Sequence, residues 1–455
     1  MLTVEKIGGT SMSALQDVIK NIVLFNPDQV YGRVYVVSAF SGVTNILLEN
    51  KKTKAPGVYK KLADGEDYAT ALLDVASQLK TLNAQYAPLG LDLQKADAFI
   101  DGEIEQVLRY LDSATTMLAS GYLNEGILLA VREILASIGE SHSAYVLATI
   151  LQNQGVNTHL IDLAGLHDSR AMTINERIKD SFAAIDLASS VCIVTGYAKG
   201  KEGIMREFDR GYSEVTFSKI AEILKPQEAI IHKEYHLSTA DPGLVGVENV
   251  KPVGNTNYDI ADQLADVGME AIHPKASKPL EMAGIHLRIK NTFEPAHPGT
   301  LITKEYISDL NRIEVITGTD KQLIIDIYDP LMTGNVGSDL DIMQCFADHG
   351  VSYTFKTTSA NSISIVIWEN DLQEALINTL KSKFERVTYK PIAMVCLLGT
   401  NMGQSTLLAN ATTALAKAEI AVIATGMASG RVNMQFVVDR EQFKPAIIAL
   451  NKAVG

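Results

Sequence analysis

Short apolar runs alternate with helical stretches in the first part of this chain, and this alternation restricts its fold more than any other feature. Runs typical of β-strands lie at Thr3–Ile7, Val34–Ser38, Thr158–Asp162 and Val191–Thr195. Strands separated by helices favour an α/β fold with an open, mainly parallel sheet between helices. The stretch from about Val58 to Leu135 reads as helical, so we expect a helical insertion between two parts of the sheet.

A second pattern begins after the segment Asn291–Tyr306, which contains Pro295, Pro298 and Gly299 and reads as a linker. Strand, helix, strand, strand and helix then follow each other twice, which is typical of paired ferredoxin-like modules. A single α+β domain is the alternative. We expect three domains, at residues 1–305, 306–385 and 386–455. The predicted elements of the two copies are Leu323–Tyr328, Ser338–His349, Val351–Thr357, Ser362–Ile367 and Leu372–Leu380, then Ile392–Leu398, Thr406–Glu419, Ile420–Thr425, Val432–Val438 and Glu441–Lys452.

The chain is acidic, with a formal net charge of −13 over 455 residues. Such a chain repels nucleic acid and anionic membranes, so we expect neither as a partner. We find no apolar run of the length that a membrane span needs and no signal peptide at the N-terminus. Cys192, Cys345 and Cys396 lie in apolar runs without metal-ligand spacing, which indicates buried thiols in a reducing cytoplasm.

The strongest local motif is Lys6-Ile7-Gly8-Gly9-Thr10-Ser11, in which a strand ends in a lysine and a helix begins near Ser13. Glycines let backbone N–H groups approach a phosphate, and a helix N-terminus adds partial positive charge. Lys6 can place its ammonium against the β- and γ-phosphates. A plain strand-to-helix turn is the alternative, and neither a P-loop nor a dinucleotide-binding glycine motif occurs in the chain.

Several further segments, in order along nearly the whole chain, resemble the aspartokinases, a branch of the amino-acid kinase family. The tandem modules resemble the ACT domains of that family. Two segments, Phe208–Glu214 and His232–His236, are similar to the divergent aspartokinases associated with ectoine biosynthesis. The segments that carry the family resemblance are Lys6–Ser11, Val36–Asn45, Gly139-Glu140, Arg210–Glu214, Thr239–Pro242, Ile272–Pro274, Asn291–Phe293 and Pro298–Ile302.

The resemblance implies an aspartate kinase that uses ATP with Mg²⁺ to phosphorylate the side-chain carboxylate of L-aspartate, as a first step toward lysine and related amino acids or toward ectoine. No metal ligands on the chain are implied. Lys6 and Glu214 would be catalytic, Glu214 by holding Lys6 in place. The substrate would be bound by Thr44, Glu140, Arg210, Gly211 and Ser213, and the nucleotide by Lys6, Gly8, Gly9, Ser11, Lys233, Thr239 and Asp241.

Six positions depart from the family pattern, several of them where the family binds its nucleotide. Glu214 stands in place of the usual Asp, and Tyr212 in place of Gly. His232-Lys233 lies where many members have Thr-Asp, and Gly243 and Glu270 fall where a basic residue is common.

The chemistry needs no general base, because a side-chain carboxylate with a pKa of about 4 is already ionised at neutral pH. Catalysis then rests on positioning and charge neutralisation. Three alternatives remain open: a kinase for another acid such as glutamate, a catalytically inactive amino-acid sensor, and a zinc site at His232 and His236, which a strand-and-loop reading of that segment disfavours.

The modules predict a homodimer or higher homo-oligomer and a possible amino-acid effector. Thr354 lies where many feedback-inhibited relatives carry Asp, and a hydroxyl binds an effector ammonium less strongly than a carboxylate does. We therefore expect weak or absent inhibition by lysine. Purely structural modules are the alternative.

Overall fold

The computed structural model describes residues 1–51, 53–121, 124–207, 211–269, 272–427, 430 and 432–454. The chain forms two compact units, and each is described by itself. The first unit contains Met1–His236 and His273–Thr303, and the second contains Leu237–Ile272 and Lys304–Gly455. The segment Leu237–Ile272 therefore folds with the C-terminal part of the chain.

The first unit is built on a sheet whose strands run in the order β3-β4-β2-β1-β5-β7-β8. The pairs are parallel up to β7, and only β8 is antiparallel to its neighbour β7. The predicted α/β class and mainly parallel sheet are confirmed, with strand ends within one residue of those expected. The strands are β1 (Thr3–Ile7), β2 (Arg33–Val37), β3 (Thr158–Ile161), β4 (Val191–Thr195), β5 (Glu228–Lys233), β7 (Leu287–Asn291) and β8 (Thr300–Thr303).

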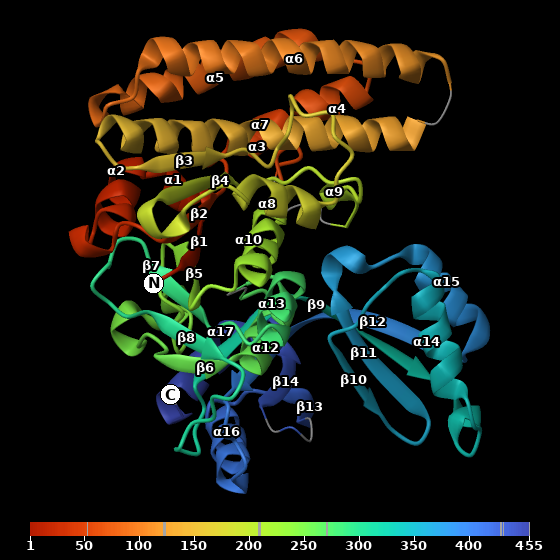
Figure 1. Cartoon of the computed structure of the whole chain (residues 1–455). Coiled ribbons are helices and arrows are strands. Elements are labelled where there is room, and N and C mark those ends of the chain that lie inside the picture. The colour runs from red at the N-terminus through yellow and green to blue at the C-terminus, as the bar shows by residue number, and fades with distance from the viewer. Residues whose placement is uncertain are drawn as a thin grey trace. The chain divides into compact units, whose positions relative to one another are not determined.

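Of the long helices, α7 lies against this sheet, and α5 and α6 lie over α7 on the side away from the strands (Figure 1). The expected helical insertion is present, but its last helix, α7, continues well beyond Leu135 and packs on β3 and β4. The helices of this unit are α1 (Gly9–Ser13), α2 (Leu15–Val18), α3 (Val43–Leu47), α4 (Val58–Ala63), α5 (Tyr68–Tyr86), α6 (Leu93–Ala119), α7 (Asn124–Asn153), α8 (Ile174–Phe182), α9 (Ile204–Glu207), α10 (Tyr212–Leu224) and α13 (Pro274–Met282).

Helix α7 is unusually apolar for a helix of this length. Its segment Glu125–Asn153 would be long and apolar enough to cross a membrane, which we did not expect from the sequence. However, 83% of the most apolar window is buried within the fold, as in a core helix. The apolar composition is therefore explained by packing against the sheet and the neighbouring helices.

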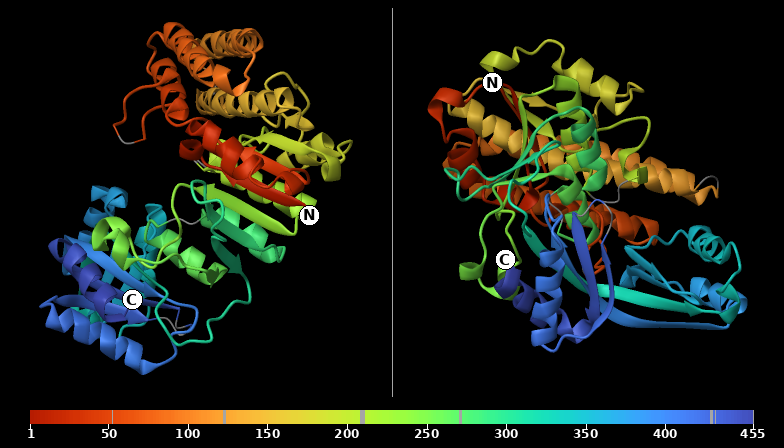
Figure 2. Two further views of the ribbon diagram at one scale, coloured as in Figure 1. Left: turned by 90° about the vertical axis from the view of Figure 1, so that its left-hand side faces the viewer. Right: turned by 90° about the horizontal axis from the view of Figure 1, so that it is seen from below.

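The second unit contains an antiparallel sheet with the strand order β10-β11-β9-β12-β14-β13 (Figure 2). The expected βαββα order is present in both copies. The elements are α11 (Pro242–Val245), β6 (Asn255–Asn257), α12 (Tyr258–Asp266), β9 (Val315–Tyr328), α14 (Ser338–Asp348), β10 (Phe355–Thr358), β11 (Ser362–Trp368), α15 (Glu374–Lys383), β12 (Arg386–Leu398), α16 (Ser405–Lys417), β13 (Val422–Met427), β14 (Asn433–Asp439) and α17 (Phe443–Val454).

Strands β9 and β12 run through both copies. The second half of β9 pairs with β11 and with the first half of β12, whereas its first half pairs with the second half of β12, which in turn pairs with β14. A β-bulge at Ile392/Met394 separates the two halves. From the sequence we expected only Leu323–Tyr328 and Ile392–Leu398, because the polar residues Thr319–Gln322 and Thr388–Lys390 interrupt the apolar pattern.

Candidate functional site

The carboxyl ends of four parallel strands meet at one edge of the first sheet. Ile7 at the end of β1 is in register with Val37 of β2 and His232 of β5, and Val37 is in register with Thr195 of β4. Ligands of open α/β sheets bind at this edge, because the loops that follow the strands converge there. The loops after β1, β2 and β4 carry most of the predicted site.

A cavity of about 290 Å³ opens at this edge. Its lining brings together residues that are more than a hundred positions apart in the chain, including the predicted substrate-binding residues Thr44, Glu140, Gly211 and Ser213 and the predicted nucleotide-binding Gly9. Arg210 lies outside the described residues. The lining residues are Gly9, Thr10, Ser38–Gly42, Thr44, Asn45, Glu140 and Gly211–Ser213.

The carboxyl of Glu140 lies on α7 and is buried. Burial raises its pKa to about 8, an effect that Ser213, the charge of Lys6 and the Ala39 backbone amide only partly oppose. Among the described residues its Oε2 atom has no hydrogen-bond partner. A buried carboxyl with an unsatisfied oxygen at the wall of a cavity is prepared to accept a hydrogen bond from a cationic ligand.

Gly196, directly after β4, gives Glu140 its space. A Cβ atom added there would lie 2.8 Å from Oε2 of Glu140, 2.7 Å from Cβ of Ser213 and 2.6 Å from the carbonyl oxygen of Val37. Gly211 precedes α10 with a φ of 88°, a backbone conformation that only glycine adopts without strain. The N-terminus of α10 then brings Ser213 to the cavity, where its Oγ lies 3.1 Å from Oγ of Ser38.

Lys6 and Glu214 form the predicted pair, with Nζ of Lys6 3.8 Å from Oε1 of Glu214. The backbone N–H of His273 donates to Oε2 of Glu214 at 2.8 Å. Glu214 is thus fixed from the segment before α13 while it faces Lys6. The family usually has Asp at this position, and the longer side chain of Glu214 also reaches Lys6.

Ser11 faces the interior of the unit. It is fully buried, and its Oγ donates to Glu234 at 3.1 Å and accepts from the hydroxyl of Thr292 at 3.0 Å. The N–H of Gly8 points to the carbonyl of His232 at 3.5 Å. These contacts hold the turn after β1 against the end of β5, where Lys233 ends the strand.

His232, one of the departures from the family pattern, belongs to a buried charge cluster. Its Nε2 lies 2.7 Å from Oε2 of Glu5, and Arg33 donates two hydrogen bonds to the same carboxylate. Although burial opposes ionisation, Arg33 and His232 hold the pKa of Glu5 well below its usual value, whereas burial lowers the pKa of His232. His236 contacts another carboxylate, Glu294, so the two histidines do not share a ligand.

Thr239 and Asp241 lie in the second unit. Asp241 caps α11 by accepting from the N–H of Gly243 at 2.7 Å, and the hydroxyl of Thr239 accepts from the N–H of Lys251 at 3.1 Å. Both side chains thus support local turns. Their predicted nucleotide contacts stay predictions.

Several residues at this edge were not among the candidate site residues, and three of them shape the site most directly. Ser38 and Gly196 each directly follow a strand, and Tyr212 begins α10. A search for the first residue after each parallel strand could have found Ser38 and Gly196. Tyr212 lies between the candidates Gly211 and Ser213 in the Arg210–Glu214 motif, and that position was the signal that could have found it.

Known proteins resemble this chain along its whole length. The profile of the amino acid kinase family matches residues 1–291. The aspartate kinase Ask_Ect of Stutzerimonas stutzeri is 41% identical over 100% of this chain and 97% of its own length. Aspartokinase 1 of Arabidopsis thaliana, a chloroplast protein, is 25% identical over 99% of this chain and 79% of its own length.

Two solved structures share the fold. The Clostridium acetobutylicum aspartate kinase superposes with a TM-score of 0.74 at 22% identity, covering 100% of both chains. E. coli aspartokinase III in complex with aspartate and ADP superposes with a TM-score of 0.70 at 18% identity, covering 100% of this chain and 99% of the other.

Proposed function

We propose how this chain, which belongs to the amino acid kinase family, works as an aspartate kinase. The reaction transfers a phosphoryl group from ATP to the side-chain carboxylate of L-aspartate and forms 4-phospho-L-aspartate. The full-length identity to Ask_Ect supports this activity and confirms the resemblance to the ectoine-associated subgroup.

The assignment of the substrate rests on the buried carboxyl of Glu140 and its unsatisfied oxygen. A fully buried carboxyl with a free oxygen is costly unless a cation completes it, and the α-ammonium of an amino acid is such a cation. Thr44 and Ser213 add hydroxyl groups beside it, and the N-terminus of α10 favours a bound carboxylate. By the family resemblance, Arg210 grips the α-carboxylate.

Lys6 then acts at the phosphoryl group. The ammonium, fixed by Glu214, neutralises charge on the β- and γ-phosphates, while the backbone N–H of Gly9 approaches them and that of Gly8 stays with the carbonyl of His232. Ser11 stabilises this turn through its hydrogen bond to Glu234. Lys233, at the end of β5, adds a second positive charge for the nucleotide. The acceptor is already an anion, so the chain supplies position and positive charge rather than a base.

The nucleotide brings Mg²⁺ with it in this proposal. The described residues contain no cluster of three or more His, Cys, Asp or Glu side chains that could hold a metal ion. Mg²⁺ accepts phosphate oxygens and water readily, and it screens the charge of the triphosphate when bound. The chain's own part is to hold the phosphates at the turn after β1.

The assignment is tested by measuring ADP release with aspartate, with glutamate and without acceptor, using hydroxylamine to trap the acyl phosphate. Glu140→Gln should lower kcat/KM for aspartate by about a hundredfold, because a charge-assisted hydrogen bond to the ammonium is lost, and leave the KM for ATP nearly unchanged. Glu103→Gln removes another buried carboxyl, on α6 and outside the cavity, and is the matched control. Equal loss in both variants, or preference for glutamate, contradicts the assignment.

We also propose a domain division, an oligomeric state and a location for this chain. The division into a catalytic domain at 1–305 and ACT modules at 306–385 and 386–455 accounts for the two βαββα copies. We propose a homodimer or higher homo-oligomer through these modules, a possible amino-acid effector there, and a cytoplasmic location. Light scattering on the full chain and on a variant with charges introduced on edge strand β13 tests the assembly.

A further inference from the structure

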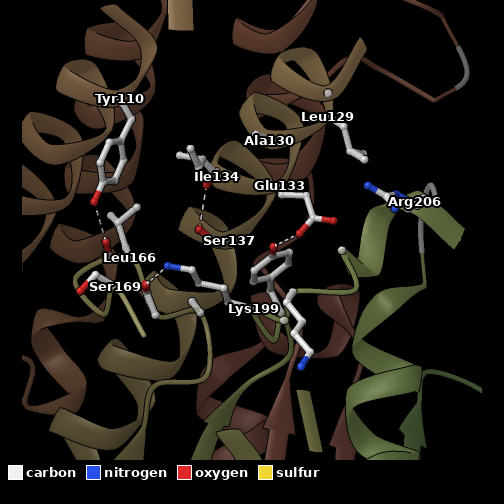
Figure 3. A pocket seen from close by; sticks show the side chains of 17 residues that line it. Tyr110, Leu129, Ala130, Glu133, Ile134, Ser137, Leu166, Ser169, Lys199 and Arg206 are labelled. Atoms are coloured by element: carbon white, nitrogen blue, oxygen red, sulfur yellow. Dashed lines mark hydrogen bonds between the residues drawn. The ribbon is translucent and has the colours of Figure 1, made fainter. Parts of the chain in front are cut away.

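A second, larger cavity of about 500 Å³ lies in the first unit, between α6, α7, α9 and the loops that follow β3 and β4 (Figure 3). It shares no lining residue with the cavity that contains Glu140. Cavities of this size with apolar walls and a few polar groups are typical of small-molecule sites. The aspartate kinase reaction uses none of its residues.

The walls are mainly apolar. Ile134 on α7 lies near Leu166 from the loop after β3 and the ring of Tyr110 at one end of the cavity, and Leu129 lies at the other end beside Arg206. The hydroxyl of Tyr110 donates to the carbonyl of Leu166 at 3.2 Å, so this aromatic wall is fixed. An apolar or aromatic body could replace water here without leaving these groups unpaired.

Glu133 is the carboxylate that lines the cavity. The carboxylate of Glu133 accepts hydrogen bonds from the hydroxyl of Tyr197 and, at 2.8 Å, from the N–H of Met205. It joins α7 to the loops after β4, and both of its partners are neutral donors.

Three cationic side chains also line the cavity: Lys199, Lys201 and Arg206. Lys199 donates to the carbonyl oxygens of Gly165 at 3.1 Å and Asp168 at 2.7 Å, and the carboxylates of Asp162 and Asp168 act on its charge, so it is already engaged. Lys201 and Arg206 are exposed at the rim, and within the described ranges their side chains form no hydrogen bond or ion pair. Two exposed cations at the rim, Lys201 and Arg206, are therefore the groups that favour an anionic ligand, with Glu176 as the carboxylate that acts on Lys201.

We propose that this cavity is a second ligand site that binds a small organic anion with an apolar or aromatic body. The body lies between Leu129, Ile134 and Tyr110, and the anionic group meets Lys201 and Arg206 at the rim. The wall toward the substrate cavity is formed by Tyr197, whose ring packs edge-on against Tyr212 with centroids 5.7 Å apart. Tyr212 lines the substrate cavity, so the two sites are neighbours with separate interiors.

Binding to the full-length chain tests the site, with 1-naphthoate, uncharged 1-naphthamide and cationic 1-naphthylmethylamine as matched probes. Saturation-transfer NMR and calorimetry should show one saturable site for naphthoate. The other two probes should bind at least about fivefold more weakly than naphthoate does. Repeating the titration with 1-naphthyl phosphate shows whether the site prefers a carboxylate or a phosphate as the anionic group. Saturating aspartate should not displace naphthoate.

Two variants localise the probe. Lys201→Ala/Arg206→Ala should weaken naphthoate about fivefold, whereas the control Lys20→Ala/Lys179→Ala, which removes the same charge from exposed positions elsewhere, should not. Ala130→Trp, at an exposed position of α7 that lines the cavity, should abolish binding of all three probes while thermal unfolding stays cooperative. Displacement by aspartate, equal affinity for the three probes, or equal loss in both double variants overturns the proposal.

Discussion

The ammonium of Lys6 lies 3.8 Å from the carboxylate of Glu214, and the backbone N–H of His273 holds the other oxygen of that carboxylate. The lysine therefore has a fixed place near the end of β1. This arrangement prepares a positive charge for the position at which negative charge develops during phosphoryl transfer.

Lys6→Met should lower kcat by about a hundredfold or more, because the side chain keeps its length but loses the charge that faces the phosphoryl group. Steady-state kinetics with aspartate and ATP measure this effect, and circular dichroism checks that the fold is retained. Lys20→Met, at an exposed position in the segment that follows α2, serves as the control. Near-normal turnover of Lys6→Met would remove the lysine from the mechanism.

Aspartate should bind more tightly as the pH rises toward 8. The pKa of Glu140 is raised to about 8, so below that pH the carboxyl holds a proton that the substrate ammonium must displace. The affinity is expected to rise by up to about tenfold per pH unit and to level off above pH 8, with release of a proton on binding. Calorimetry in two buffers of different ionisation enthalpy counts that proton. A flat profile, or the same slope in Glu140→Gln, contradicts the assignment.

Gly196→Ala should damage aspartate binding specifically, since the added methyl group meets Glu140, Ser213 and the Val37 carbonyl within 2.8 Å. The backbone oxygen cannot move away cheaply, so the side chains at the cavity must shift. We expect kcat/KM for aspartate to fall by at least about tenfold with a smaller change in the KM for ATP. Gly102→Ala, in α6 with open space around it, is the control and should leave both values unchanged.

Glu5→Gln should destabilise the first unit without a direct effect on substrate binding. It leaves the buried guanidinium of Arg33 without its counter-charge, which costs about 3–5 kcal/mol of unfolding free energy near neutral pH. Because the pKa of Glu5 is held below 4.5 in the folded state, its stabilisation is complete above that pH and is lost as the pH falls. The difference from the wild type should therefore shrink in acid.

Urea unfolding at several pH values measures this difference. The matched variant Glu228→Gln breaks the more exposed pair with Arg288 and should cost less. An equal loss in the two variants would show that burial is not what makes the Glu5 cluster important.

Lysine should inhibit the enzyme weakly or not at all. The hydroxyl of Thr354 accepts from the side chain of Gln322 at 3.1 Å and faces the carbonyl of Val366 at 3.4 Å, so it offers an effector ammonium no charge. Titration of lysine and threonine, separately and together, into the kinase assay measures the response. Strong inhibition by lysine alone at sub-millimolar concentration would show that Thr354 does not discriminate between effectors.

The sequence by itself determined the α/β class, the order of the two βαββα copies and the position of Lys6, Gly8 and Gly9 at the end of the first strand. Such features depend on the period of apolar residues and on local turn chemistry, which neighbouring residues carry. The ordered motifs were also sufficient to select Thr44, Glu140, Gly211 and Ser213, which the fold brings to one cavity.

Only the tertiary structure decided the rest, because it depends on contacts between distant segments. Ser11 turns inward since Glu234 and Thr292 surround it, and His232 is engaged by Glu5, 227 positions away. The length of β9 follows from pairing with β12 across a polar stretch that has no strand pattern of its own. The raised pKa of Glu140 likewise results from burial, a property of the packed protein that no local motif encodes.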